Sequence, residues 1–163
     1  MRVVRDATIH DHAAVLALNN SATPHVNALS AEQLAWLVDH AAYFRVCADD
    51  AGVAGFIIAL PSGLSYWSDN YQWFASRRES FLYLDRVVVA TRAQRRGVGQ
   101  ALYKDITAFA MERWPRIALE VNLRPPNPVS LAFHDVMGFR RVGQRDYDDG
   151  EKSVVMLERT LPE

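Results

Sequence analysis

Six residues near the middle of the chain, 94–99, have the composition of a phosphate-binding loop. They read Gln-Arg-Arg-Gly-Val-Gly, follow a run of β-branched residues that predicts a strand, and precede a helical pattern. A strand, a glycine loop and a helix start aim several backbone N–H groups and the helix dipole at one point, which favours a bound phosphate. Glycines also remove side chains that would keep a ligand from the backbone. The loop is therefore predicted to hold an anionic cofactor.

Two common phosphate-binding loops fit this stretch poorly. A nucleoside-triphosphate loop needs Gly-Lys-Ser/Thr, but Gly99 is followed here by Gln100 and Ala101. A dinucleotide-binding loop needs a third small residue in the first strand–helix turn. Leu102 stands at that place, and the loop lies in the middle of the chain. The nucleoside-triphosphate loop is therefore excluded, and the dinucleotide-binding loop lacks its third small residue.

The loop resembles the Q/R-x-x-G-x-G/A pyrophosphate loop of the GNAT superfamily of acyl-CoA-dependent N-acetyltransferases. The preceding strand, 84–89, is similar to the motif A strand of that family. Residues 127–139 are similar to its motif B, N-x-x-(A/S)-x-x-(F/L)-(Y), followed by Gly-Phe. The order of the predicted elements also resembles the family's fold over almost the whole chain. The resemblance implies acetyl-CoA as cofactor and an amine of a small molecule or peptide as acceptor, attacked directly in a ternary complex.

The same resemblance implies three groups of cofactor-binding residues. Backbone N–H groups of the loop would hold the pyrophosphate, and backbone groups of the motif A strand would bind the pantetheine arm and polarise the acetyl carbonyl. The motif B asparagine would contact the pantetheine arm, although it can also serve only as a helix cap. These residues are Gln94, Arg95, Arg96, Gly97, Val98, Gly99 and Gln100 in the loop, Val87, Val88 and Val89 in the strand, and Asn127, Ser130 and Phe133 in motif B.

Three side chains are candidates for proton transfer. The acceptor amine must lose a proton before it attacks, and Asp85 and Glu120 are carboxylates within apolar strands, where burial could raise the pKa. Either could instead be a structural partner of Arg86 or Arg124. Many GNAT enzymes carry a tyrosine seven residues after the motif B asparagine, placed to protonate the CoA thiolate, and His134 stands there. Its imidazolium is a stronger acid than a thiol, so His134 either donates this proton or only packs while the thiolate leaves unassisted.

An aromatic-rich segment, 61–74, shows no clear periodicity and is predicted to be a long loop. Loops of this length in compact domains are often functional. Its rings could enclose a cationic amine, or they could cover the core or a dimer interface. The residues predicted to bind the acceptor are Asn70, Tyr71, Trp73 and Asn122.

Periodicity and turn residues predict an α/β (α+β) fold with about seven strands. Helices are expected after the caps Asp11, Ser30 and Asn127 and after the glycine loop, with the first helix ending at 19–20. Strand, helix and strand over 81–121 indicate a parallel, right-handed crossover. The resemblance implies a GNAT-like, mostly antiparallel sheet with flanking helices and one parallel strand pair splayed around the cofactor. The predicted strands are 2–7, 43–49, 52–60, 81–89, 116–121, 139–147 and 153–159.

Length and composition predict a single domain over residues 1–163. The net charge of −1 gives no overall attraction to nucleic acid or acidic membranes, so the arginines at 92–96 form a local cluster. One cysteine, Cys47, excludes an internal disulfide and suits a reducing cytoplasm, and no apolar run resembles a signal peptide or membrane span. Composition predicts a cytoplasmic protein, and the resemblance implies an acetyltransferase without a metal. A homodimer is left open. The alternative is a catalytically silent acyl-CoA-binding regulatory module.

Overall fold

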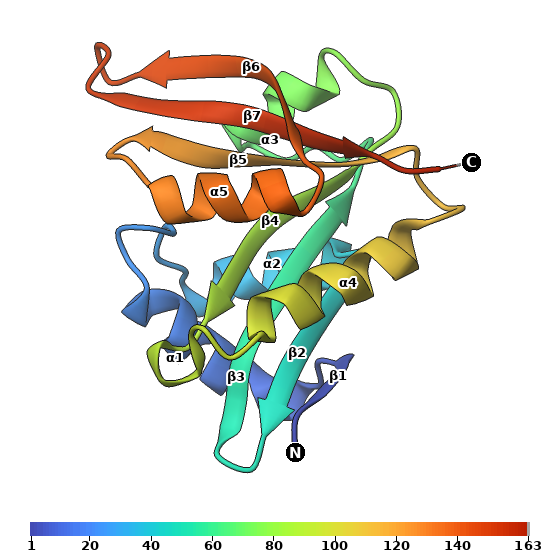
Figure 1. The fold of residues 1–163 in the computed structure, drawn as a ribbon, viewed down its shortest axis with the longest axis vertical. Helices are drawn as coiled ribbons and strands as arrows, with labels where there is room; N and C mark the ends of the chain where they lie inside the picture. The colour runs from blue at the N-terminus through green and yellow to red at the C-terminus, as the bar shows by residue number, and fades with distance from the viewer. Residues whose placement is uncertain (163) are drawn as a thin grey trace. The chain divides into compact units, whose positions relative to one another are not determined.

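The chain forms one mixed sheet of seven strands within residues 1–162, the part that the computed structural model describes (Figure 1). The strands are β1 (Val3–Asp6), β2 (Tyr43–Asp49), β3 (Gly52–Pro61), β4 (Leu82–Val89), β5 (Arg116–Arg124), β6 (Arg140–Tyr147) and β7 (Lys152–Thr160). Their order is β1-β2-β3-β4-β5-β7-β6. β4 and β5 run parallel, whereas β1 with β2, β2 with β3, β5 with β7, and β6 with β7 run antiparallel. The predicted mostly antiparallel sheet with one parallel pair is confirmed.

Five α-helices accompany the sheet in the described part of the chain. They are α1 (His12–Ser21), α2 (Ala31–His40), α3 (Asp69–Ala75), α4 (Val98–Ala110) and α5 (Pro128–Val136), with short 3₁₀ helices at Ile9–Asp11 and Thr91–Ala93. Two predicted caps are confirmed. Ser30 and Gln33 form a capping box at α2, and the Asn127 side chain accepts from the Ser130 N–H at 3.3 Å ahead of α5. None of these helices is both long and apolar enough to cross a membrane.

The chain divides into two compact units, and β4 contributes residues to both. The first unit comprises residues 1–61 and 84–109, and the second comprises 62–83 and 110–162. Each unit therefore contains its own strands and helices, drawn from two separate stretches of sequence. The single domain expected from the chain length stays a prediction.

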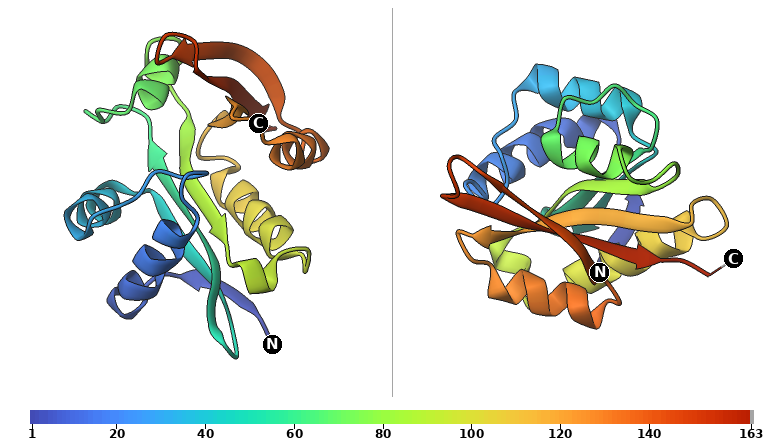
Figure 2. Two further views of the ribbon diagram at one scale, coloured as in Figure 1. Left: turned by 90° about the vertical axis from the view of Figure 1, so that its left-hand side faces the viewer. Right: turned by 90° about the horizontal axis from the view of Figure 1, so that it is seen from above.

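In the first unit, helices cover both faces of β2 and β3. α1 and α2 lie on one face, and α4 lies on the other (Figure 2, left). Gly55 of β3 makes the approach of α4 possible, because a Cβ there would lie 3.1 Å from Val98 Cγ1 and 3.3 Å from Leu102 Cδ1. Val98 is the first residue of α4, so this close packing holds the start of the helix against β3.

In the second unit, α3 and α5 lie on opposite faces of β5, β7 and β6 (Figure 2, right). α3 packs against β6 through Trp73, because Gly143 has no side chain there. A Cβ at Gly143 would lie 2.6 Å from Trp73 Cη2. Tyr71 and Phe74 of α3 are fully buried and pack against the ring of Tyr83, with centroids 5.3 and 6.1 Å away. α3 is thus held on its face of the sheet by aromatic packing.

Three local predictions differ from the structure. Asp11 stands at the predicted N-cap position of α1, but its side chain makes no capping hydrogen bond, because its carboxylate binds the Arg5 guanidinium at 2.7 and 3.0 Å and the Thr8 N–H at 2.8 Å. The Arg5 contact holds the pKa of Asp11 well below its usual range. The segment 61–74 is not irregular throughout, since it contains the start of α3, capped by Ser68. The expected end of the first helix at 19–20 was also wrong, because α1 continues to Ser21.

Candidate functional site

The loop between β4 and α4 exposes its backbone at the start of a helix. Arg95 has φ 63° and Gly97 has φ 82°, so the chain turns twice through the left-handed region before α4 begins. Gln94, Arg95 and Arg96 are exposed, whereas Val98 is buried. Successive N–H groups in such turns form a concave site for an anion, and the positive end of the helix dipole adds to it. The predicted loop therefore has the backbone geometry that binding an anion requires.

Positive side chains surround this loop. Within residues 1–162, the guanidinium groups of Arg95 and Arg96 have no ion-pair partner. Arg2 donates to the backbone carbonyl of Arg96, and its guanidinium would lie 3.4 Å from a Cβ at Gly97. Arg92 differs, since it forms an ion pair at 2.7 Å with an aspartate of β2. The turn geometry and the nearby cations suit a pyrophosphate. Arg2 belongs to this positive cluster, and no sequence motif indicated it.

Glu120 of β5 lies in a hydrogen-bonded group in the second unit. The Tyr83 hydroxyl donates to its carboxylate and lies 2.7 and 2.9 Å from the two oxygens. The Asn70 amide donates to Oε1 at 3.1 Å. Tyr83 pairs with Ala118 in the parallel register, and Glu120 is two residues further on, so both side chains leave the same face of the sheet. Two neutral donors orient this half-buried carboxylate.

Asn70 connects Glu120 to an arginine that the sequence did not single out. Its Oδ1 accepts a hydrogen bond from Arg145 Nε at 3.0 Å, while its amide nitrogen donates to Glu120. The Arg145 guanidinium carbon lies 4.6 Å from the centre of the Tyr147 ring. Asn70 therefore uses both ends of its amide within the protein, which favours a positioning role over the predicted contact with the acceptor.

Asp85, the other candidate base, forms an ion pair with Arg86. Arg86 Nε lies 2.8 Å from Asp85 Oδ2, and the Asp85 side chain is 4% exposed. Arg86 also donates to Asn19 Oδ1 and to the Asn27 carbonyl, both at 3.0 Å. This pair thus anchors the end of α1 and the segment that follows it. The geometry favours the structural alternative for Asp85.

The predicted acceptor residues occupy different environments. Tyr71 is fully buried, and its hydroxyl accepts from the Leu64 N–H at 3.0 Å, so its side chain lies in the core. Its contact with the acceptor stays a prediction. Burial also raises the pKa of Tyr71. The Trp73 ring packs on β6 at Gly143, and the Arg77 guanidinium carbon lies 3.9 Å from the centre of this ring. Asn122 is half-buried and lies on the same strand face as Glu120.

His134 is buried in α5 rather than displayed. It is 4% exposed, and its Nδ1 lies 2.7 Å from the Ser130 carbonyl, so Nδ1 carries the proton of that hydrogen bond. Phe133 and Phe139 contact it edge to face, with ring centroids 5.4 Å away. Burial lowers the pKa of His134, partly offset by the bond to Ser130. A neutral, packed imidazole is a poor general acid, so the structure favours the packing alternative.

The other predicted cofactor residues lie at the start of α5 and in β4. Asn127 and Ser130 are half-buried at the start of α5, where the Ser130 hydroxyl lies 3.3 Å from His134 Nδ1. In β4, Val88 is buried and its neighbours Val87 and Val89 are partly exposed. Their contacts with a cofactor stay predictions.

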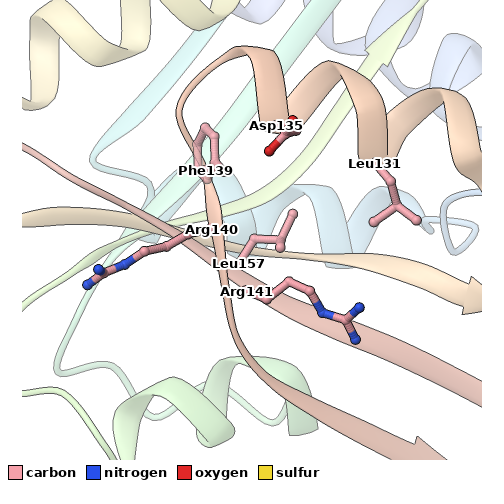
Figure 3. Close-up of a pocket in the computed structure, with 6 residues that line it drawn as sticks. All are labelled: Leu131, Asp135, Phe139, Arg140, Arg141 and Leu157. Atoms are coloured by element: carbon pink, nitrogen blue, oxygen red, sulfur yellow. The ribbon is translucent and has the colours of Figure 1, made fainter.

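A shallow pocket lies in the second unit, between the end of α5 and the first residues of β6 (Figure 3). It is on the Leu157 side of β7, the opposite face from Met156. None of the predicted catalytic residues lines it. Its lining residues are Leu131, Asp135, Phe139, Arg140, Arg141 and Leu157.

Comparison with known proteins shows the family. Residues 13–139 match the acetyltransferase (GNAT) family, so the chain belongs to that family. GNAT acetyltransferases use acetyl-CoA. No curated protein sequence matches this chain.

Solved structures share the fold over nearly the full chain. The ribosomal-protein-S18-alanine N-acetyltransferase from Escherichia coli is 16% identical, with a TM-score of 0.73, over 100% of this chain and 96% of the other. Ard1 from Thermoplasma volcanium is 20% identical, with a TM-score of 0.77, over 99% of both chains. NAA60 from Arabidopsis thaliana, in complex with a bisubstrate analogue, is 14% identical, with a TM-score of 0.77, over 99% of this chain and 98% of the other. These similarities establish the GNAT fold.

The burial of His134 predicts how stability depends on pH. Because its pKa in the folded protein is lowered from 6.5, the unfolded chain takes up a proton that the folded chain does not, and the free energy of unfolding falls as pH drops below about 6.5. His134→Phe removes this contribution, so this variant should lose less stability than the wild type between about pH 7 and pH 5 in urea denaturation. His25→Gln, at an exposed histidine, should keep the wild-type slope. Equal slopes for His134→Phe and wild type would contradict the burial argument.

Proposed function

We propose that this protein transfers the acetyl group of acetyl-CoA to a primary amine of a small molecule or peptide, by direct attack in a ternary complex. The observation that carries the proposal is the loop 94–100. In a chain of the GNAT family, it combines two left-handed residues, exposed positions at 94–96 and arginines without an ion pair at the start of α4. This combination suits a pyrophosphate.

The proposed cofactor contacts follow from this loop. Backbone N–H groups of Arg95 to Gln100 hold the pyrophosphate, and Arg2, Arg95 and Arg96 add positive charge. Acetyl-CoA supplies a thioester whose carbonyl carbon accepts the amine. The family resemblance supports pantetheine contacts by Val87, Val88, Val89, Asn127, Ser130 and Phe133.

Glu120 is the proposed general base. A carboxylate oriented by Tyr83 and Asn70, both neutral donors, keeps the capacity to accept a proton from the amine, directly or through one water. Asp85 instead forms an ion pair with the Arg86 guanidinium, so its carboxylate already has a structural partner. We assign Asp85 a structural role and Tyr83 the role of holding the Glu120 carboxylate.

Replacing Glu120 tests the assignment of the base. Glu120→Gln keeps the shape and the hydrogen bond from Tyr83 but cannot take a proton, so kcat should fall by about 10²–10⁴-fold. Acetyl-CoA affinity, measured by calorimetry, should stay unchanged. Activity is followed as free thiol released from acetyl-CoA with a panel of primary amines, and Glu151→Gln at an exposed turn residue is the control.

Two outcomes would overturn these assignments. Wild-type kcat in Glu120→Gln would remove Glu120 as base. Tight acetyl-CoA binding without thiol release for any amine would favour the catalytically silent module over an enzyme.

The departing thiolate, we propose, receives no proton from His134. Because the imidazole is buried and its Nδ1–H is held by Ser130, His134→Phe should keep kcat within a few-fold of wild type. The shape of the kcat–pH profile should also be unchanged. An acid role would instead give a wild-type kcat that falls as pH rises, and His134→Phe would abolish this fall together with most of the rate.

A further inference from the structure

We propose that Arg145, assisted by Asn122, binds a carboxylate of the acceptor, so that the acceptor is an amino acid or a similar small amine with a carboxylate a few bonds from its nitrogen. This inference rests on the proposed function, because it places the reacting amine at Glu120. It concerns only residues of the second unit, whose contacts follow below.

Strand register places the three side chains on one face of the sheet. Glu120 of β5 is opposite Met156 of β7, and Asn122 is opposite Val154. Arg145 of β6 is also opposite Val154, from the other side of β7. Directly opposite residues share a face, and Met156 and Val154 are two residues apart, so all of these side chains leave the same face. α3 lies on this face, and α5 lies on the other (Figure 2, right).

Arg145 is oriented by the protein but not neutralised by it. Its Nε donates to Asn70 Oδ1, and its guanidinium stacks on Tyr147. Within residues 1–162, its two terminal amino groups have no hydrogen-bond or ion-pair partner. Arg78 and Arg116 of the same unit, by contrast, both form ion pairs with Glu158.

An arginine fixed in this way presents two parallel N–H donors, the arrangement that binds a carboxylate bidentately. Asn122 adds a further polar group, because its half-buried side-chain amide makes no hydrogen bond within the described residues. Asn122 and Arg145 are both opposite Val154, from the two sides of β7. Asn122 thus offers a further donor on the same face of the sheet, on β5, two strands away from Arg145 on β6.

The bridging amide limits the length of the acceptor. Asn70 lies 3.1 Å from Glu120 Oε1 and 3.0 Å from Arg145 Nε, so the base oxygen and the guanidinium are at most about 8 Å apart along this path. Two hydrogen bonds of about 3 Å leave room for the few bonds between the amine and carboxylate of an amino acid. The charges also match, since the Glu120 carboxylate is negative where the amino group binds and the Arg145 guanidinium is positive where the carboxylate binds. A peptide whose carboxylate lies many residues from its amine does not fit this spacing.

Matched acceptors test this proposal. Each amino acid in a panel is compared with its carboxamide and with the amine that lacks the carboxyl group, using thiol release from acetyl-CoA. The wild type should prefer the acids by about tenfold or more in kcat/KM, through KM. Arg145→Gln should lose this preference and leave the carboxamides within about twofold. Arg145→Lys should recover part of it, because it keeps the charge but not the planar fork.

The matched control is Arg141→Gln, an exposed arginine on the same strand, which should retain the wild-type preference. Circular dichroism checks that each variant is folded. A second measurement avoids turnover: calorimetry should show that the wild type binds N-acetylated amino acids more tightly than N-acetylated carboxamides, and that Arg145→Gln does not.

The outcomes separate this inference from the proposed function. Thiol release with amines but no preference for acids, or a preference that survives in Arg145→Gln, overturns the carboxylate site and leaves the acetyltransferase intact. Thiol release with peptides but not with amino acids also overturns the carboxylate site and leaves the acetyltransferase intact. Acetyl-CoA binding without thiol release for any amine overturns both.

Discussion

The backbone turn at Arg95 and Gly97 is the constraint on which the first unit's contribution to function depends. Two left-handed residues in three positions turn the chain directly before α4, where the first N–H groups of the helix have no partner within the helix. Gly55 allows α4 to pack closely on β3 at Val98, the first residue of the helix. This contact holds the start of α4, and with it the preceding turn, against the strand. A loop carried by a closely packed helix presents its N–H groups in a fixed array, which lowers the entropy cost of binding an anion.

In the second unit, two carboxylates on apolar strands, Glu120 and Glu158, differ in the groups that bind them. Glu158 of β7 is 2% exposed and lies beside Arg78 and Arg116, so its charge is committed to two cations. Glu120 is instead hydrogen-bonded to a tyrosine and an amide, and its nearest bridged cation, Arg145, stands one amide further away. Hydrogen bonds from neutral donors hold this carboxylate in one orientation, which suits proton transfer. The same arrangement leaves Arg145 with donors for another anion.

Sequence predicted what depends on local chemistry. The caps Ser30 and Asn127, the alternation of the strands and the order of loop, helix and strand are encoded within a few residues of one another, and the structure has them. α3 was missed because its core-facing positions are aromatic residues with weak helix propensity, and only Ser68 marked its start. The group around Glu120 was found only in part, because Asn70 and Arg145 are 75 residues apart and Tyr83 reaches Glu120 through the parallel register. The motif position of His134 was readable, but its burial between Phe133 and Phe139 depends on packing that no spacing reveals.

The most direct measurement of the account is the response of individual backbone amides to acetyl-CoA, followed by ¹⁵N–¹H NMR during a titration. Because the N–H groups of the loop are proposed to hold the pyrophosphate, the resonances of Arg95 to Gln100 should show the largest shifts, and desulfo-CoA, which keeps the pyrophosphate, should reproduce them. Saturation without shifts in these amides, or no binding at all, would contradict the central claim.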